Sequence, residues 1–289
     1  MPQPDNGKHA PPGRITQRGW LILLTGYMLV LIAWGVTYEP GTIPAGLLHI
    51  ARSPGLLVSD YLAIAGLSAT FVNAGLVGLT GLVLAYVNDV PLSGPTVAAI
   101  FTMAGFGLFG KTWWSIWPII LGVALFSRVT RHPFKSYILV AMYGTALAPL
   151  VTQVAYGFGW GILPGALFGL GMGFLLPPVA VYMLRLHQGF NIYNVGLTCG
   201  FLGLFVTALL AGAGFDIAPA FHWAEQYSPV LGRFLLIYVS SLLVIGLILT
   251  RGLGRLRALV SEAGTLPTDF VELYGGGTTL INMGAVGLL

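Results

Sequence analysis

The sequence predicts an all-α fold, a polytopic transmembrane helical bundle. The prediction rests on an apolar composition, a series of membrane-length segments and an internal repeat. Of the 289 residues, 56% are hydrophobic and only 8% are charged, whereas a soluble domain carries about 25% charged residues. A soluble fold needs more polar cover than this chain can supply. The 41 glycines and 18 prolines also suit a membrane protein, because small residues let helices approach closely and neighbouring helices satisfy backbone groups that proline frees.

Nine apolar segments follow one another, each near the length of about 20 residues that crosses a hydrocarbon core. The third segment is short, because Ser93, Gly94 and Pro95 form a helix start that leaves about 14 residues, or about 21 Å of helix, before Phe109. It is either a short crossing or a half-helix preceded by unwound backbone, which is tolerated only where protein buries it or water lines it. The nine segments cover residues 19–38, 61–87, 90–110, 112–127, 137–157, 160–184, 195–214, 234–250 and 270–289.

Basic residues predict the orientation of the bundle. If all nine segments cross and the N-terminus is cytoplasmic, ten of the 13 Lys and Arg lie inside, and only Arg52, Lys111 and Arg233 lie outside. If the third segment enters the membrane and returns to the same side, only five of these basic residues lie inside. The positive-inside rule therefore favours nine crossings. We expect an integral protein of the bacterial inner membrane, with residues 1–18 as a disordered cytoplasmic tail and Lys111 at the outer boundary of a segment.

The most informative sequence feature is an internal repeat at a constant offset of 282 − 73 = 209 residues. Asp60 and Asp269 are each followed, thirteen residues later, by an asparagine, Asn73 or Asn282. Each asparagine opens the pattern Asn-x-Gly-x-x-Gly-Leu, and residues 47–79 share eleven identities with residues 256–288. Asn194 lies in a weaker third echo of the Asn-x-Gly core. The sequence thus predicts a duplication.

The repeat divides the chain into a first membrane repeat unit, residues 19–231, and the start of a second repeat, residues 232–289. Its period contains seven predicted crossings, an odd number, so the second copy enters the membrane in the opposite sense. Inverted repeats recur in membrane transporters, with the substrate site near the midplane. The counterpart of residues 80–128 would fall beyond Leu289. We therefore expect a missing C-terminal half, a completing second chain, or a half-protein that forms a homo-oligomer.

Polar residues of the repeat are the first candidates for a substrate pathway. Asn73 and Thr80 are seven residues apart and share one helix face with Gly66, with Thr70 close by. Paired amides from two inverted repeats could hydrogen-bond a small polar solute. The alternative is that Asn and Thr join helices while glycine permits close packing. Both interpretations remain open at the sequence level.

The turn from Leu92 to Thr96 is the second candidate. A half-helix start offers unpaired N–H groups and the positive end of the helix dipole to an anion or a carbonyl oxygen. The alternative is an ordinary interhelical turn capped by Ser93. The complete predicted pathway is Thr70, Asn73, Thr80, Ser93, Thr96, Asn194, Thr279 and Asn282.

Several function classes are disfavoured. The sequence contains no metalloprotease motif, no nucleophile elbow and no phosphate loop, so we expect no enzyme, no catalytic residue and no cofactor. A single cysteine, Cys199, excludes an internal disulfide and a cysteine-based metal cluster, and we expect it to be a small packing residue. The net charge of +4 is explained by orienting loops, so no nucleic-acid partner is expected. Intramembrane carboxylates or histidines are scarce, which disfavours a proton pump.

Glycines also recur every four residues from residue 161 to residue 173, at positions 161, 165, 169 and 173. Such a spacing places them along one face of a helix, which allows a second helix to approach closely. We expect a helix-packing surface here.

The repeated Asn-x-Gly-x-x-Gly, the Leu92–Thr96 turn and the stretch Gly105–Lys111 resemble an uncharacterised bacterial family of polytopic membrane proteins, a domain of unknown function. The resemblance covers residues 19–289. Inverted repeats with a short proline-started helix are also loosely similar in architecture to urea channels. The leading hypothesis is a membrane transporter or channel for a small polar or anionic solute, with the lipid bilayer and that solute as partners. The alternative is a non-catalytic membrane scaffold or a subunit of a larger membrane complex.

Overall fold

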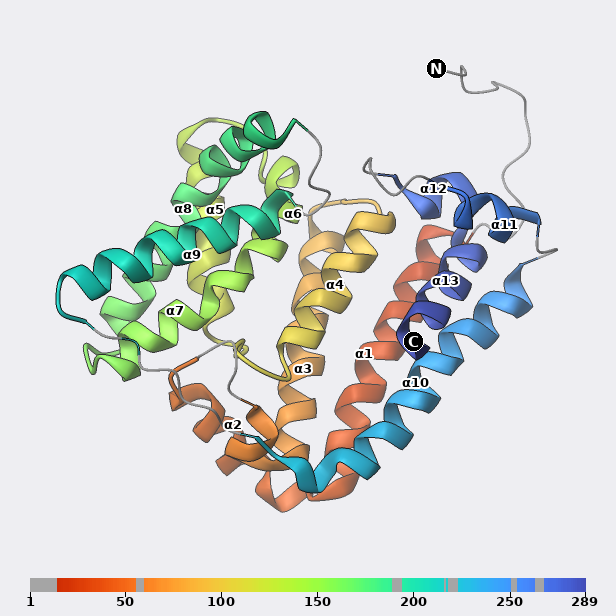
Figure 1. Cartoon of the computed structure of the whole chain (residues 1–289), viewed down its shortest axis with the longest axis horizontal. Helices are drawn as coiled ribbons and strands as arrows, with labels where there is room; N and C mark the ends of the chain where they lie inside the picture. Colours follow the sequence, from red (N-terminus) through yellow and green to blue (C-terminus); the bar gives the residue numbers. More distant parts are fainter. Residues whose placement is uncertain are drawn as a thin grey trace. The chain divides into compact units, whose positions relative to one another are not determined.

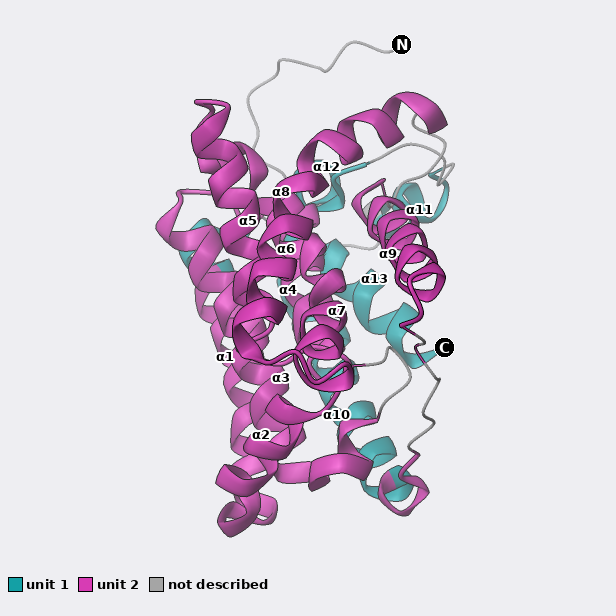
Figure 2. Cartoon of the chain, turned by 90° about the vertical axis from the view of Figure 1, so that its left-hand side faces the viewer, with its two compact units in different colours: residues 1–20, 228–289 teal, residues 21–227 magenta. Residues whose placement is uncertain are grey.

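The computed structural model describes residues 15–55, 60–188, 194–215, 217, 223–250, 254–262 and 268–289. The chain divides into two compact units, unit 1 (residues 1–20 and 228–289) and unit 2 (residues 21–227), coloured teal and magenta in Figure 2. Every regular element named in the described residues is a helix, so the predicted all-α class is confirmed. Along the chain, unit 2 ends at residue 227 and unit 1 resumes at residue 228.

Unit 2 includes most of α1 and all of α2–α9, which are labelled in Figure 1. The stretch from residue 134 to residue 157 is built of short α, 3-10 and π turns rather than one regular helix. The α-helices are α1 (Gln17–Tyr38), α2 (Ile43–Arg52), α3 (Tyr61–Val87), α4 (Gly94–Phe106), α5 (Ile116–Val129), α6 (Ile138–Gly144), α7 (Ala148–Thr152), α8 (Ile162–His187) and α9 (Asn194–Gly212).

Unit 1 is smaller. Its main contact is the packing of one long helix on the last helix of the chain. Its α-helices are α10 (Ser228–Leu249), α11 (Gly254–Val260), α12 (Phe270–Tyr274) and α13 (Gly276–Leu288).

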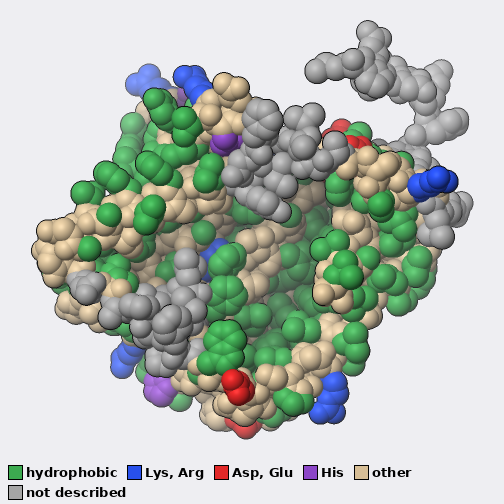
Figure 3. Space-filling view, viewed as in Figure 1, with side chains coloured by type: hydrophobic (Ala, Val, Ile, Leu, Met, Phe, Trp, Pro, Cys, Tyr) green, Lys and Arg blue, Asp and Glu red, His purple; other side chains and the backbone are tan. Residues whose placement is uncertain are grey.

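Six helical stretches of the described residues are long and apolar enough to cross a membrane. Many of their large apolar side chains face outward, and Figure 3 shows hydrophobic side chains over much of the visible face. Such a surface suits lipid rather than water. The six stretches indicate an integral membrane protein; they are Gln17–Tyr38, Tyr61–Val87, Phe134–Gly157, Ile162–His187, Asn194–Gly212 and Glu225–Leu249.

The other three expected segments are shorter or interrupted. The third begins where predicted, with Ser93 extended before Gly94 and with Pro95 in the first turn, but α4 has only 13 residues. α5 has 14 residues. The last segment is interrupted at Gly275, whose positive φ separates α12 from α13. These three are therefore not single membrane-length helices.

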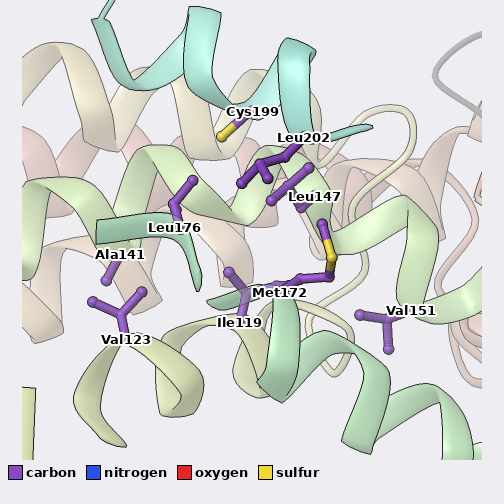
Figure 4. Close-up of a cluster of buried hydrophobic side chains, with 9 residues drawn as sticks. All are labelled: Ile119, Val123, Ala141, Leu147, Val151, Met172, Leu176, Cys199 and Leu202. Atoms are coloured by element: carbon purple, nitrogen blue, oxygen red, sulfur yellow. The ribbon is translucent and has the colours of Figure 1, made fainter. Parts of the chain in front are cut away.

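One hydrophobic core cluster of unit 2 consists of nine buried side chains from neighbouring helices (Figure 4). Cys199 belongs to it and is 5% exposed, so its predicted role as a small packing residue is confirmed. The cluster joins α5, the 134–157 stretch, α8 and α9; it comprises Ile119, Val123, Ala141, Leu147, Val151, Met172, Leu176, Cys199 and Leu202.

The predicted glycine face of α8 packs against its neighbours. A Cβ on Gly173 would lie 2.1 Å from the backbone oxygen of Ile119, and one on Gly169 would lie 2.5 Å from Val151. Gly165 is equally close to the backbone of Val151. Gly161 differs, because it precedes α8 with φ 96° and has open space around it. The packing surface is therefore confirmed for three of the four glycines.

Gly173→Ala should destabilise the protein, because its methyl group would collide with backbone that cannot rotate away. Overpacking of this kind costs about 1–3 kcal/mol. Gly171→Ala on the same helix is the matched control, because a Cβ there meets nothing within 4 Å and alanine favours helix over glycine by about 1 kcal/mol. Thermal unfolding in detergent should show a lower Tm for Gly173→Ala and an unchanged or higher Tm for Gly171→Ala. Equal Tm values would contradict the close α5–α8 contact.

Candidate functional site

The most unusual part of unit 2 is the loop between α4 and α5, Gly107–Ser115, because it is irregular backbone inside an apolar bundle. Lys111, Thr112 and Ser115 are each no more than 1% exposed. Buried backbone N–H and C=O groups outside helices need partners, since leaving them unpaired is costly. The position of this loop therefore depends on the groups that satisfy it.

Other irregular segments meet the loop. The backbone N–H of Tyr61 donates to Leu108 O at 3.3 Å, and Asp60 pairs with Phe109 as an isolated bridge. The N–H of Gly55 donates to Thr152 Oγ1 at 2.7 Å, and a Cβ on Gly55 would lie 3.1 Å from Gly110 O. We call this meeting point the junction; it comprises Gly55, Asp60, Tyr61, Gly107–Ser115 and Thr145–Thr152.

Asn73, in the middle of α3, holds the loop at the junction. Its side-chain NH2 group donates to Gly107 O at 2.7 Å and to Lys111 O at 2.8 Å. Its Oδ1 accepts from the backbone N–H of Trp113 at 3.0 Å. Both donors and the carbonyl oxygen of this amide are thus engaged by backbone, and the side chain is 2% exposed. The geometry makes Asn73 a positioning residue for the loop.

Thr80 acts on the same side of α3. Its Oγ1 donates to Leu76 O at 2.8 Å and accepts from Trp113 Nε1 at 3.1 Å. Asn73 and Thr80 therefore both bind Trp113, one through its backbone and one through its ring. The prediction that they share one helix face is confirmed.

α3 is broken near its start. Gly66 has φ 75° and ψ 174°, a conformation that is open almost only to glycine. Thr70 Oγ1 donates to Gly66 O at 2.7 Å, which satisfies the carbonyl at the break. The side chain of Asp60 accepts from Leu62 N at 2.9 Å and so caps the short first piece. Thr70 thus stabilises the interruption of the helix.

Lys111 is the charged group of the junction. Its side chain is 1% exposed, its Nζ donates to Thr145 Oγ1 at 2.9 Å, and Nζ lies 4.7 Å from the centre of the Phe106 ring. Among the described residues, no carboxylate forms an ion pair with it. Lys111 lies between α4 and α5, at the segment boundary where the sequence predicts it, and its side chain is buried because the loop folds into the unit.

The helix that receives Lys111 is itself irregular. Thr145–Leu147 is a 3-10 turn and Gln153–Gly157 is a π turn. Thr145 Oγ1 donates to Met142 O at 2.6 Å while it accepts from Lys111. Turns of these types within a helix often mark functional hinges. The junction therefore brings together three interrupted helical segments of unit 2.

Ser93 and Thr96 lie at the opposite end of α4 from the loop. Ser93 makes no side-chain cap hydrogen bond; its Oγ lies 3.4 Å from Thr96 Oγ1. Thr96 Oγ1 donates to Pro91 O at 2.8 Å, and its side chain is 1% exposed. A helix of 13 residues is about 20 Å long, so these two residues are not part of the junction.

Asn194 begins α9 and joins it to α8. Its Oδ1 lies 2.8 Å from His187 Nε2, and its Nδ2 donates to Ala180 O at 3.3 Å. These contacts are of the helix-joining kind. Asn191, with which the third echo opens, lies outside the described residues.

In unit 1, residues 269–279 have the same local structure as residues 60–70 of unit 2. Asp269 caps α12 by accepting from Val271 N and Glu272 N, and Gly275 has φ 84° and ψ 158°. Thr279 Oγ1 donates to Gly275 O at 3.0 Å. The cap, the broken helix and the threonine bond thus match those of Asp60, Gly66 and Thr70. Asn282 follows and is half-buried.

The match extends to helix packing that the sequence alignment does not reach. In unit 2, a Cβ on Gly35 of α1 would lie 2.6 Å from Ser68 O of α3; in unit 1, a Cβ on Gly246 of α10 would lie 2.7 Å from Gly277 O of α13. Two glycines of α3 face α1, and two glycines of α13 face α10 in the same order. The pairs are Gly75 on Ile32, Gly78 on Met28, Gly284 on Leu243 and Gly287 on Val239.

One difference separates the two copies. Val77 of α3 is fully buried, whereas its counterpart Val286 of α13 is 62% exposed. In unit 2, α4 and the loop cover this part of α3; Gly107, for example, packs on Ala74. Among the described residues, a junction of this kind is thus found only around α3.

Sequence reasoning misses Lys111 and the loop as the centre of the site. A signal was available, because a lone lysine within an apolar stretch of a membrane protein is by default a functional candidate. In the described part of the chain, no group of three or more His, Cys, Asp or Glu side chains could hold a metal ion.

A family model described as "Protein of unknown function (DUF1576)" matches residues 39–212, more than half of the chain. The match includes all of the junction and ends before unit 1 resumes at residue 228. Comparison with curated proteins finds no match, and comparison with solved structures finds none either.

Asn73→Asp should destabilise the protein strongly, although the two side chains are almost the same size. A carboxylate cannot donate to Gly107 O and Lys111 O, so two buried carbonyls lose their partner, each at about 1–3 kcal/mol. Asn88→Asp at the end of the same helix is the control, since Asn88 makes one bond to Leu84 O and is half-buried. Thermal unfolding in detergent should show a much larger fall in Tm for Asn73→Asp. Similar changes in the two variants would refute the positioning role.

Proposed function

The chain belongs to the DUF1576 family, whose description assigns no function, and we propose from the geometry of the junction that it is a membrane transporter or channel for a small polar or anionic solute. One observation carries the proposal: interrupted helices meet around a buried charged side chain inside an apolar bundle. Irregular backbone and charge are costly there and persist in membrane proteins chiefly where a solute path runs.

The local duplication supports this proposal. We infer that α1–α3 and α10–α13 are two copies of one unit, on the basis of matching caps, breaks and glycine contacts. Transporters built from internal repeats place the solute site near the midplane and use broken helices there. We propose the bacterial inner membrane as the location, with the N-terminus on the cytoplasmic side because Lys8, Arg14 and Arg18 precede the first apolar segment.

The predicted pathway residues take different parts in this proposal. Asn73 and Thr80 hold the loop, and Thr70 satisfies the break in α3. They therefore shape the path rather than offer free polar atoms to a solute. Thr279 does the same at the break in α12–α13. Within the junction, the charged group that could meet a solute directly is Lys111.

A second candidate is a subunit or scaffold of a larger membrane complex. The exposed face of α13 favours it, since Val286 is 62% exposed where Val77 is buried. A partner helix could cover that face as α4 covers α3. A stable complex with a co-purifying membrane protein, together with no solute flux, would favour this candidate.

Flux through proteoliposomes tests the transport proposal. The purified full chain should pass small solutes from a panel of urea, glycerol, nitrate and formate faster than protein-free vesicles do. Gly66→Ala should reduce that flux, because alanine at φ 75° and ψ 174° costs about 1–3 kcal/mol and favours an unbroken α3. Gly26→Ala on α1, where a Cβ meets nothing within 4 Å, is the control.

If no solute of the panel passes faster than through empty vesicles, the transport proposal fails. If flux occurs but Gly66→Ala leaves it unchanged in a protein of normal stability, the break in α3 is not part of the path. Both outcomes are readable from the same set of vesicles.

A further inference from the structure

The side chain of Lys111 is buried, and no carboxylate of the described residues forms an ion pair with it. Asp60, the one carboxylate of the junction, instead accepts from the backbone N–H groups of Leu62 and Ala224. An ammonium group has three N–H donors. One donates to Thr145 Oγ1, and the ring of Phe106 covers another side at 4.7 Å. A hydroxyl and a ring face satisfy an ammonium only partly, because neither carries a negative charge.

Burial of an uncompensated charge is among the most costly features of a protein. A lysine retained for stability alone would be better replaced by an apolar side chain of similar volume. The loop nevertheless places this lysine where three interrupted segments meet, and Asn73 fixes the carbonyl of the same residue at 2.8 Å. The position of Lys111 is therefore held from both its backbone and its side chain.

We propose that Lys111 is an anion-binding site and that the solute of this protein is a small monovalent anion. The inference rests on the proposed transport function and narrows its substrate class. A single positive charge compensates a single negative one. A dianion would remain uncompensated, and its desolvation cost is higher because it grows with the square of the charge. The apolar surroundings of Phe106 also favour weakly hydrated ions such as nitrate over sulfate.

The neighbouring turn suggests how the anion is held. Thr145 Oγ1 accepts from Lys111 and lies in a 3-10 turn between two short helices. The lysine exchanges this hydroxyl for the anion when the solute arrives, and it returns to the hydroxyl when the solute leaves. The hydrogen bond to Thr145 is thus the resting state of the site.

The test compares Lys111→Met with Lys135→Met, the exposed lysine just before α6. Two readouts are used on the purified full chain: nitrate flux in proteoliposomes, and the Tm in detergent with and without nitrate, with sulfate at matched ionic strength as reference. We expect Lys111→Met to lower nitrate flux by about tenfold or more, the loss typical of a charge-assisted contact. Lys135→Met should behave as the unmodified protein.

The Tm readout separates an anion site from a structural lysine. Nitrate should raise the Tm of the unmodified protein and of Lys135→Met, but not that of Lys111→Met. Without nitrate, Lys111→Met should unfold at the same temperature as the unmodified protein or higher, because it removes an uncompensated buried charge. Should Lys111→Met fail to fold, Thr145→Val decides, because it keeps the lysine and removes its hydroxyl partner. A changed nitrate-dependent rise in Tm in Thr145→Val supports the anion site, and an unchanged rise overturns it.

The remaining outcomes distinguish this inference from the transport proposal. If urea or glycerol passes while nitrate does not, or if nitrate flux persists in Lys111→Met, the anion inference fails and transport stands. If no solute passes but nitrate raises the Tm only when Lys111 is present, the anion site stands and transport fails. If neither flux nor a Lys111-dependent rise in Tm occurs, both fail.

Discussion

The contact between the Asn73 amide and the backbone of the α4–α5 loop organises unit 2. Three hydrogen bonds from one side chain, of 2.7, 2.8 and 3.0 Å, fix Gly107, Lys111 and Trp113. Without them, the loop would leave backbone groups unpaired in an apolar interior. Because the loop is held there, Lys111 reaches Thr145, Trp113 reaches Thr80, and Leu108 meets the start of α3. The other contacts of the junction depend on this one.

The same constraint explains why α4 and α5 are short. Their loop turns at the level of Asn73, in the middle of α3, rather than beyond the end of the bundle. A loop at that depth must be satisfied by protein, and α3 provides an amide, a hydroxyl and small residues for the purpose. Helix length, buried charge and interrupted backbone thus have one physical origin.

Much of this fold could be predicted from the sequence because it follows from local rules. Apolar composition gives the helical class, Ser93–Pro95 gives the start of α4, and the spacing of glycines gives the packing face of α8. The repeat locates Asp60, Gly66 and Thr70 together with their counterparts. The three hydrogen-bond partners of Asn73 could not be predicted, since they lie 34–40 residues away along the chain. The burial of the Lys111 side chain could not be predicted for the same reason, because only the tertiary contacts of its loop bury it.

The central claim is that the loop Gly107–Ser115 is a fixed, hydrogen-bonded part of the interior. The most direct test is hydrogen–deuterium exchange of the purified chain in lipid nanodiscs, comparing peptides from residues 107–115 with peptides from the α3–α4 turn, residues 88–93. The account predicts slower exchange in the first, because the amides of Lys111, Thr112 and Ser115 donate within the protein and these residues are no more than 1% exposed. Amides in residues 88–93 are hydrogen-bonded too, but Asp89 and Pro91 are exposed. Exchange in residues 107–115 as fast as in residues 88–93 would contradict the account.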